Sequence, residues 1–406
     1  MSKDISSKKD KLYKELELKL DLGIEGINYD PLIFSETLKK HPNLLRKNLC
    51  MAGDKDFSQE VSTQYISSVN LENGLNIYLG LNKRSPYTLE AKEDGFYISR
   101  NGETLSKLYL PYEPKFYSLK ATDGTPMNTV AANYGADLEH GNGAIVVAYS
   151  NECSLGDKGE DCLFCNINAT KARYGESECI KWKYPRQIAD TVKAAYAEGY
   201  DHLTITGGFI PERREVEYYL DTAEVIKEVL GRETFNGTAC IGAPQDLSVI
   251  EKYKEAGFST IGINMEVWNK DFFKAICPGK EKECGGYENW IKAIDYALDV
   301  FGKGNVRSNF VAGLEPKEYL LEGIEILSSK GVVATATQWG PNAGSKFEGH
   351  RTPTLEWHLE VALKITDIIR KNGITYEKLY NATPATFLMH DIYRIEEELL
   401  PVFNNR

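Results

Sequence analysis

Three cysteines stand close together in one segment of the chain. Cys153, Cys162 and Cys165 lie between an apolar run at residues 143–150 and a stretch with the pattern of an amphipathic helix. Thiolates are the usual ligands of iron–sulfur clusters, and a cubane [4Fe–4S] cluster normally takes four of them. Three cysteines alone would leave one iron open to a cofactor or substrate. We therefore predict a [4Fe–4S] cluster on these three residues.

Two other uses of cysteine explain the pattern less well. The close C-x2-C pair is also half of a zinc ribbon, but zinc would need a second pair of ligands at matching spacing. His140 and His202 are isolated, and Cys277 and Cys284 belong to a different element. Eight cysteines in 406 residues is ordinary usage, and no signal peptide precedes them, which disfavours disulfides.

The cysteine segment resembles the radical S-adenosylmethionine (radical SAM) superfamily. Phe164 stands just before the last cysteine, and a Gly-Gly-Phe run follows one predicted strand later. The usual family spacing is C-x3-C-x2-C, whereas here it is C-x8-C-x2-C, so we expect the loop to differ in shape. The resemblance covers residues 143–349 and comes closest to the biotin synthase and tyrosine lyase branch. It implies S-adenosylmethionine as a second cofactor and a reduced flavodoxin or ferredoxin-type electron donor.

The same resemblance assigns candidate cofactor contacts, which include Phe164. Gly207 and Gly208 match the glycine pair whose backbone carbonyls hold the amino group of the methionine moiety, although Phe209 replaces the acid that often follows. A plain strand-to-helix turn is the alternative for this pair. Asn264 and Glu266 share one strand face by the period of two, and Glu266 resembles the acid that binds the ribose hydroxyls.

Further candidates lie on the next strand. Arg307 resembles the positive residue that pairs with the methionine carboxylate, since a guanidinium can bind a carboxylate through two hydrogen bonds. A buried salt bridge between Arg307 and Glu266 is the alternative use of both residues. Ser308, on the opposite face, and Gly313, at the bend where related enzymes place the adenine, complete the candidate set. Residues 338–345 are either a substrate or adenine loop or a turn.

The positions of these residues follow from an alternation of strands and helices. Apolar, β-rich runs occur at 145–150, 202–207, 236–242, 259–267, 305–314 and 332–339. Helical patterns follow them at 185–199, 214–230, 246–257, 287–301, 317–331 and 354–372. Such alternation implies parallel strands with right-handed crossovers. We predict an α/β fold, a partial (β/α)6 TIM-type barrel, with the chemistry at the carboxyl ends of the strands.

The rest of the chain divides around this barrel. Residues 1–142 are predicted to form an α+β extension of unknown role, with helices at 8–20 and 31–48 followed by a small antiparallel sheet. Asn-Gly and Asp-Gly pairs at residues 73–74, 94–95 and 101–102 are hairpin signals. Residues 350–406 are predicted to be a helical region that packs on the barrel. On it His390 and Arg394 share a helix face, which we expect to be exposed to solvent.

Composition limits the function classes. Hydrophobic residues make up 42%, mean hydropathy is −0.39, and no apolar run reaches the roughly eighteen residues of a membrane span. A net charge of −11 disfavours sequence-independent binding to nucleic acid. Without a targeting segment we expect a cytoplasmic protein.

The reaction itself is less constrained, and no catalytic residue is assigned. We expect a lyase or rearrangement on a small molecule that carries a carboxylate. Sulfur insertion is disfavoured, because Cys240 matches only one of the three cysteines that biotin synthase uses for its second cluster. Cys277 and Cys284 are either ligands of a second cluster, participants in the radical chemistry or ordinary loop thiols. The alternatives are a non-catalytic iron–sulfur or metal-binding barrel in assembly or electron transfer, and a radical SAM enzyme acting on a peptide or RNA.

Overall fold

A curled sheet of seven strands forms the centre of the computed structural model, which describes residues 2–45, 66–137, 142–175, 182–384 and 387–400. The strand order is β12-β11-β10-β9-β8-β7-β6, and β7 to β12 are parallel. The parallel strands are β7 (Asn142–Ser150), β8 (His202–Gly207), β9 (Gly237–Ile241), β10 (Thr260–Ile263), β11 (Val306–Ala312) and β12 (Val333–Gln338). The predicted partial TIM-type barrel is confirmed.

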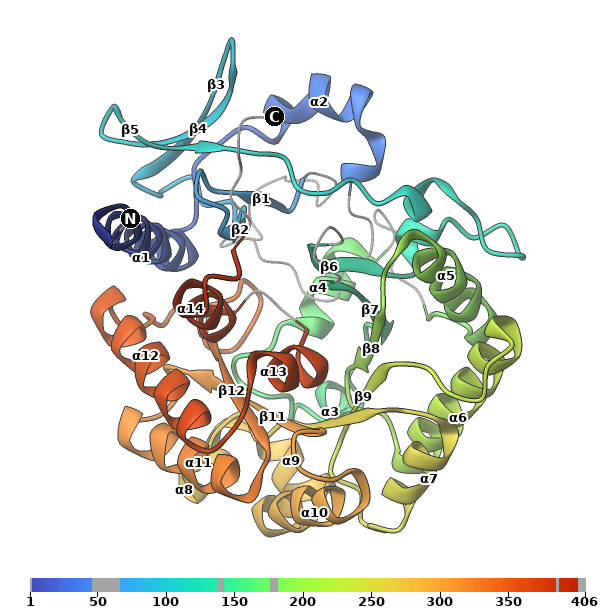
Figure 1. Cartoon of the computed structure of the whole chain (residues 1–406). Coiled ribbons are helices and arrows are strands. Elements are labelled where there is room, and N and C mark those ends of the chain that lie inside the picture. The colour runs from blue at the N-terminus through green and yellow to red at the C-terminus, as the bar shows by residue number, and fades with distance from the viewer. Residues whose placement is uncertain (1, 46–65, 138–141, 176–181, 385–386, 401–406) are drawn as a thin grey trace.

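Helices cover the outer face of this sheet (Figure 1). They are α5 (Pro185–Glu198), α6 (Glu212–Leu230), α7 (Val249–Ala256), α10 (Gly286–Phe301), α11 (Lys317–Lys330) and α12 (Leu355–Lys371). The short helices α8 (Lys270–Ile276) and α9 (Pro278–Glu283) follow β10 and contact the segment at residues 155–163. Alternate strand residues such as Leu203 and Ile205 face these helices and are fully buried in the main core. α5 and α11 each end at a glycine in the left-handed region, Gly199 and Gly331, as the sequence indicates.

One strand of the barrel sheet lies outside the predicted barrel segment. β6 (Ala132–Asp137) pairs antiparallel with β7 at the edge of the sheet. It precedes residue 143, so the barrel sheet includes part of the predicted N-terminal extension. A strand next to its partner in the chain needs only a tight connection, and the alternation of strands and helices gives no sign of it.

The N-terminal extension is α+β, as predicted. Its elements are α1 (Ser2–Glu25), η1 (Pro31–Phe34), α2 (Ser35–Lys40), η2 (Pro42–Leu44), β1 (Ser68–Asn70), β2 (Asn76–Tyr78), β3 (Tyr87–Lys92), β4 (Gly95–Arg100), β5 (Glu103–Leu108), η3 (Lys115–Ser118) and η4 (Met127–Thr129). All three predicted hairpin turns connect antiparallel strands. The single helix predicted at 31–48 is instead three short pieces over its described part, because Pro42 restricts His41 to non-helical backbone.

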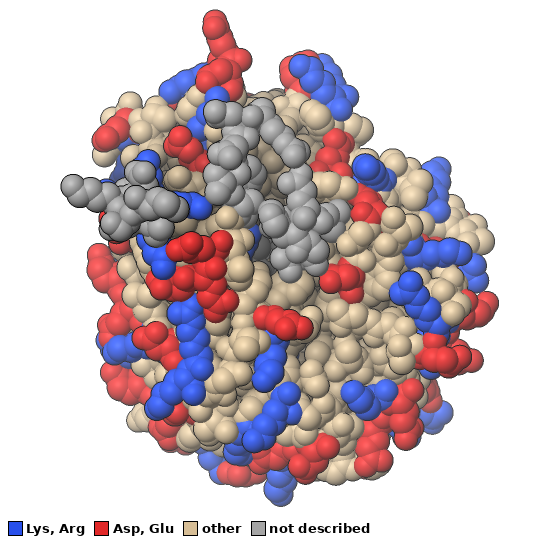
Figure 2. Space-filling model, in the orientation of Figure 1, with Lys and Arg blue, Asp and Glu red and all other residues tan. Residues whose placement is uncertain are grey.

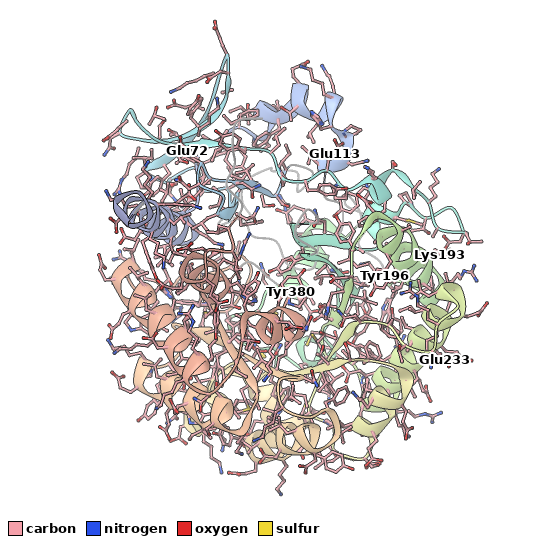
Figure 3. The ribbon with its side chains drawn as sticks, viewed as in Figure 1. Glu72, Glu113, Lys193, Tyr196, Glu233 and Tyr380 are labelled. Carbon is pink, nitrogen blue, oxygen red and sulfur yellow. The ribbon has the colours of Figure 1, made fainter. Side chains whose placement is uncertain are left out.

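The C-terminal helices close the barrel at the amino-terminal ends of the strands. α13 (Tyr376–Ala382) contacts β10 and β12, and its Lys378 packs on Gly304 just before β11. Figures 1 and 3 show α13 and its Tyr380 within the ring of strands. α14 (Leu388–Glu396) follows, and its His390 is completely buried. The expectation of a solvent-exposed helix face at His390 was therefore wrong, because this helix packs between α1, α12 and α13.

The extension and the C-terminal helices also contact each other. Lys19 of α1 forms an ion pair with the fully buried Asp391 of α14 at 2.6 Å. Gln338 at the end of β12 donates to the carbonyl of Leu20 at 3.4 Å. Thus α1 lies along the β12 side of the open barrel.

Within the described residues no helix is both long enough and apolar enough to cross a membrane. On the face shown in Figure 2, acidic and basic side chains of the described residues are interspersed.

Candidate active site

The cysteine loop leaves the carboxyl end of β7 and lies across the carboxyl end of β8. It contains the short helix α3 (Ser154–Asp157) and leads into α4 (Ile167–Tyr174). The backbone N–H of Ser154 donates to the carbonyl of Phe209 at 2.9 Å. The Asn168 side chain accepts from the N–H of Cys153 at 2.8 Å and donates to its carbonyl at 2.9 Å. The first cysteine is therefore fixed on both sides by hydrogen bonds.

Gly207 and Gly208, at the end of β8, allow the cysteine loop to approach this strand closely. A Cβ atom on Gly208 would lie 2.0 Å from the carbonyl oxygen of Glu152, and one on Gly207 would lie 2.6 Å from the ring of Tyr149. The Tyr149 hydroxyl donates to the carbonyl of Gly208 at 3.3 Å. Close backbone approach thus explains both glycines, and their predicted contact with a methionine amino group stays a prediction.

The other side of the loop is held by two segments far away in the sequence. The N–H of Leu163 donates to the carbonyl of Ile276 at 2.9 Å, and the N–H of Phe347 donates to the carbonyl of Leu163 at 3.0 Å. Asn166 donates to the carbonyl of Ala343 at 2.9 Å, which brings the predicted loop at 338–345 against the cysteines. Apolar side chains surround Cys162 and Phe164 here: Val267, Ile276, Val311, Leu314, Trp339 and Phe347. These contacts shield part of the loop from water.

The three thiols share one loop, and Cys162 is turned toward a fourth cysteine. Cys153, Cys162 and Cys165 are half-buried, whereas Cys277 is fully buried. A hydrogen bond from Cys277 lowers the pKa of the Cys162 thiol, and the charge of Lys280 adds to this effect against the desolvation caused by burial. Within the described part of the chain, no three Cys, His, Asp or Glu side chains converge on one point that could hold a metal ion.

The donor set of the loop fits an iron–sulfur cluster. Soft thiolates in an apolar setting suit iron and sulfur rather than a hard cation such as magnesium or calcium. Cys162 is hydrogen-bonded to Cys277 and the three thiols do not converge among the described residues, so this cluster assignment stays a prediction.

Glu266 is held by a lysine that the sequence analysis did not single out. Lys280 Nζ lies 2.9 Å from Glu266 Oε1 and 3.0 Å from the carbonyl oxygen of Asn264, and 4.3 Å from the centre of the Trp290 ring. The side chains of Lys280 and Glu266 are only 13% and 15% exposed. The proposed salt bridge between Glu266 and Arg307 is absent from the described contacts, since Lys280 takes that place. Burial lowers the pKa of Lys280, but Glu266 and the neighbouring thiols outweigh it and raise the pKa overall.

The candidate residues of β11 point in different directions. Arg307 and Asn309 face the inside of the barrel, where Arg307 Nη2 donates to Cys240 Sγ at 2.7 Å. Ser308 faces the opposite side, is fully buried and accepts from the N–H of Met265 at 3.0 Å. Gly313 follows the strand with a φ of +115°, and a Cβ there would lie 2.9 Å from Pro353.

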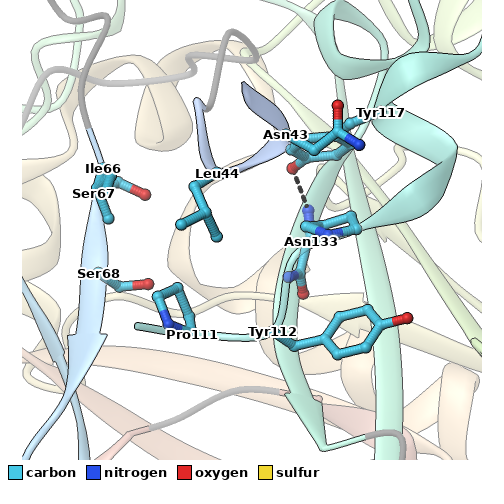
Figure 4. Close-up of a pocket in the computed structure, with 10 residues that line it drawn as sticks. Asn43, Leu44, Ile66, Ser67, Ser68, Pro111, Tyr112, Tyr117 and Asn133 are labelled. Carbon is cyan, nitrogen blue, oxygen red and sulfur yellow. Dashed lines mark hydrogen bonds between the residues drawn. The ribbon is translucent and has the colours of Figure 1, made fainter. Parts of the chain in front are cut away.

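A surface pocket lies elsewhere, in the N-terminal part of the chain (Figure 4). Its lining includes Leu44, Ser68 and Pro111, and the hydroxyl of Tyr117 accepts from the N–H of Asn133 at 2.8 Å. None of the predicted site residues lines it.

Glu215 on α6 is a buried acid that the sequence analysis missed. Burial raises the pKa of its carboxyl group to about 8, although the N–H of Gly242 donates to it at 3.4 Å. Because the folded-state pKa lies above the unfolded one, this group destabilises the fold progressively as the pH rises from about 4.5 to about 8. We expect Glu215→Gln to remove a pH-dependent loss of about 1.4 kcal/mol per pH unit in this window.

Urea unfolding of both proteins at about pH 5 and about pH 8 measures this difference. Glu217→Gln, on the exposed face of the same helix, is the matched control and should leave the pH profile unchanged. Parallel profiles for the wild type and Glu215→Gln would contradict the assignment.

Comparison with known proteins identifies the class. Residues 149–331 match the family described as the Radical SAM superfamily, a range that contains the cysteine loop, the glycine pair and β8 to β11. This match, together with the relative described next, supports an enzyme of the radical SAM superfamily.

Three individual relatives share 28% sequence identity or less with this chain. The chain is 28% identical over 309 residues to bacteriochlorophyllide c C-7(1)-hydroxylase of Chlorobaculum limnaeum, which covers 71% of this chain and 74% of the relative. Among solved structures, methylornithine synthase has a TM-score of 0.42 at 15% identity, covering 57% of this chain and 69% of that one. The FeFe-hydrogenase maturase HydG of Carboxydothermus hydrogenoformans has a TM-score of 0.45 at 15% identity, with coverages of 56% and 51%. These two structural likenesses say nothing about the substrate.

Proposed function

We propose that this protein binds a [4Fe–4S] cluster through Cys153, Cys162 and Cys165, together with S-adenosylmethionine, and removes a hydrogen atom from a small-molecule substrate. The observation that carries the proposal is the position of the cysteine loop, which lies over Gly208 at the carboxyl edge of a radical SAM barrel. When bound, the cluster and S-adenosylmethionine supply the electron and the 5′-deoxyadenosyl radical for this chemistry.

The chain's own residues orient and shield this site. The apolar side chains around Phe164 exclude water from one side of the cysteine loop. Lys280 fixes the carboxylate of Glu266, which we propose as the contact for the ribose hydroxyls. Glu266 is itself a non-glycine residue with a φ of +66°, a backbone conformation that its surroundings must hold in place. A reduced flavodoxin or ferredoxin-type protein is proposed as the electron donor.

Two fates of the substrate are candidates. A lyase or rearrangement reaction is the first. Hydroxylation is the second, and the similarity to the hydroxylase of Chlorobaculum limnaeum favours it. Its overall balance closes without a further oxidant: substrate C–H, S-adenosylmethionine and water give the alcohol, 5′-deoxyadenosine, methionine and a proton.

The deciding experiment is anaerobic reconstitution of the full chain with iron and sulfide. We expect a reduced-cluster paramagnetic resonance signal that changes when S-adenosylmethionine is added, and slow release of 5′-deoxyadenosine with dithionite. Cys165→Ala should lose the shifted signal and the deoxyadenosine, because a cluster ligand is gone. Cys284→Ala, which removes a buried thiol outside the loop, is the control and should retain both.

A signal that ignores S-adenosylmethionine, without deoxyadenosine, would instead support a non-catalytic cluster with four protein ligands. To separate the two substrate fates, the reconstituted enzyme is incubated with bacteriochlorophyllide c. A product heavier by one oxygen atom supports hydroxylation, and an unchanged pigment argues against it.

A further inference from the structure

The inner face of the barrel is mostly polar from β8 to β12, whereas β7 turns Ala144, Val146 and Ala148 to the same side. Barrel interiors are usually filled by bulky branched residues. Here the alternation along each strand turns other residue types inward. They are His202, Thr204 and Thr206 on β8, Thr238 and Cys240 on β9, Thr260 and Gly262 on β10, Arg307 and Asn309 on β11, and Thr335 and Thr337 on β12. Such a lining is suited to hold a polar ligand.

Arg307 is the charged residue within this lining. Nη2 donates to Cys240 Sγ, whereas Nε is buried and has no hydrogen-bond partner. Among the described residues no Asp or Glu forms an ion pair with it. The fold also makes room for this side chain, because a Cβ on Gly262 would lie 2.7 Å from Arg307 Nε. An unpaired charge in such a place is costly unless something binds to it.

The strand face that carries Arg307 offers hydroxyl groups and a histidine on β8 and β9. Thr204 is 4% exposed, and its Oγ1 is buried without a partner. The imidazole of His202 contacts Thr238 Oγ1 at 2.9 Å. Burial and the charge of Arg307 lower the pKa of His202 to about 3, so this ring is neutral near neutral pH. One guanidinium among neutral donors matches a singly charged carboxylate better than a phosphate dianion.

Arg307 also lies below the edge where the cysteine loop sits. It stands five residues before Ala312, the last residue of β11, and is thus about 16 Å down the strand at 3.3 Å per residue. α13 and α14 close the barrel beneath it. A ligand at this depth would lie inside the barrel rather than at its mouth.

We propose that Arg307 binds a carboxylate of the substrate inside the barrel, where the buried Thr204 hydroxyl is a further hydrogen-bonding group on the same inner face. The guanidinium can hold such a group through two hydrogen bonds. This inference adds a substrate class, a carboxylate, to the proposed function. It rests on the proposed function only because it calls the ligand a substrate. Binding itself is measurable without turnover, so the two proposals can fail separately.

The test measures binding and thermal unfolding of the full chain with three probes: benzoate, its neutral methyl ester and inorganic phosphate. Benzoate should raise the unfolding temperature of the wild type, and the ester and phosphate should do so much less. In Arg307→Met the effect of benzoate should disappear, and the ligand-free protein should unfold at a temperature equal to or higher than the wild type, because an unpaired buried charge is gone. Arg213→Met removes an arginine that is 90% exposed on α6 and serves as the control.

Three results would overturn the proposal. One is benzoate binding of equal strength in Arg307→Met, and another is a clear loss of ligand-free stability in that variant, which would mark a structural role. The third is competition between benzoate and S-adenosylmethionine, with weaker S-adenosylmethionine binding by reconstituted Arg307→Met, which would place the cofactor's own carboxylate there. Benzoate binding through Arg307 without deoxyadenosine formation would keep this inference and remove the proposed reaction.

Discussion

Gly208→Ala is expected to displace the cysteine loop and to abolish loading of the cluster. The added methyl carbon would lie 2.0 Å from the carbonyl oxygen of Glu152 and 2.9 Å from the Cα of Cys153. Both are backbone atoms, so no side chain can turn away, and the loop itself must move. We expect a loss of stability of about 1–3 kcal/mol, as for other overpacked sites, and iron content reduced several-fold after reconstitution.

Iron and sulfide analysis together with urea unfolding measures these effects. Gly349→Ala is the matched control, since no atom lies within 4 Å of the position of its Cβ and its backbone is unstrained. It should load iron like the wild type. If Gly208→Ala loads iron equally well, the contact between the loop and β8 does not position the cysteines.

Lys280→Met is expected to cause the largest loss of stability among the substitutions considered. The change leaves Glu266 as a largely buried carboxylate without its cation, and breaking such a pair typically costs about 3–5 kcal/mol. The raised pKa of Lys280 means that its contribution is fully present at neutral pH and is lost only as the pH rises through that value. Urea unfolding at neutral pH gives the size of the loss.

Two further variants make this prediction specific. Lys270→Met breaks an ion pair with Glu288 in which the two side chains are 59% and 65% exposed, and it should leave stability almost unchanged because water screens this pair. Adding Glu266→Gln to Lys280→Met should recover part of the loss, because the uncompensated charge is removed. Equal effects of Lys280→Met and Lys270→Met would show that the buried pair contributes no more than a surface one.

The parallel strands and the order of the barrel were predictable because their signals are local. Residues 202–207 alternate between two faces, and helices such as α5 end at glycines, so each unit of the barrel is visible in a short window of sequence. The cysteine spacing likewise lies within one loop. The hairpin turns at residues 73–74 and 94–95 were predictable for the same reason, because a single Asn-Gly or Asp-Gly pair is the signal for each.

The features that were missed depend on contacts between distant residues. Lys280 lies in the charged run KEKE, which is typical of a solvated helix, and only its approach to Glu266 buries it. His390 and Asp391 have the pattern of a polar face, but the packing of α14 against α1 and α12 removes them from solvent. Cys277 contacts Cys162 across more than a hundred residues, so no spacing rule connects them. Pairings of this kind become visible only in the folded structure.

The contacts between α1 and α14 join residues that are 372 and 383 positions apart, through Lys19 with Asp391 and Tyr13 with Glu396. While the chain emerges from the ribosome, α1 is made more than 350 residues before α14. The part of α1 that packs on α14 is therefore left uncovered until that helix has been made, and contacts of such high sequence separation form slowly. Closure of the barrel base is accordingly expected to follow the folding of the strands, and to be completed only after residues 388–396 have left the exit tunnel.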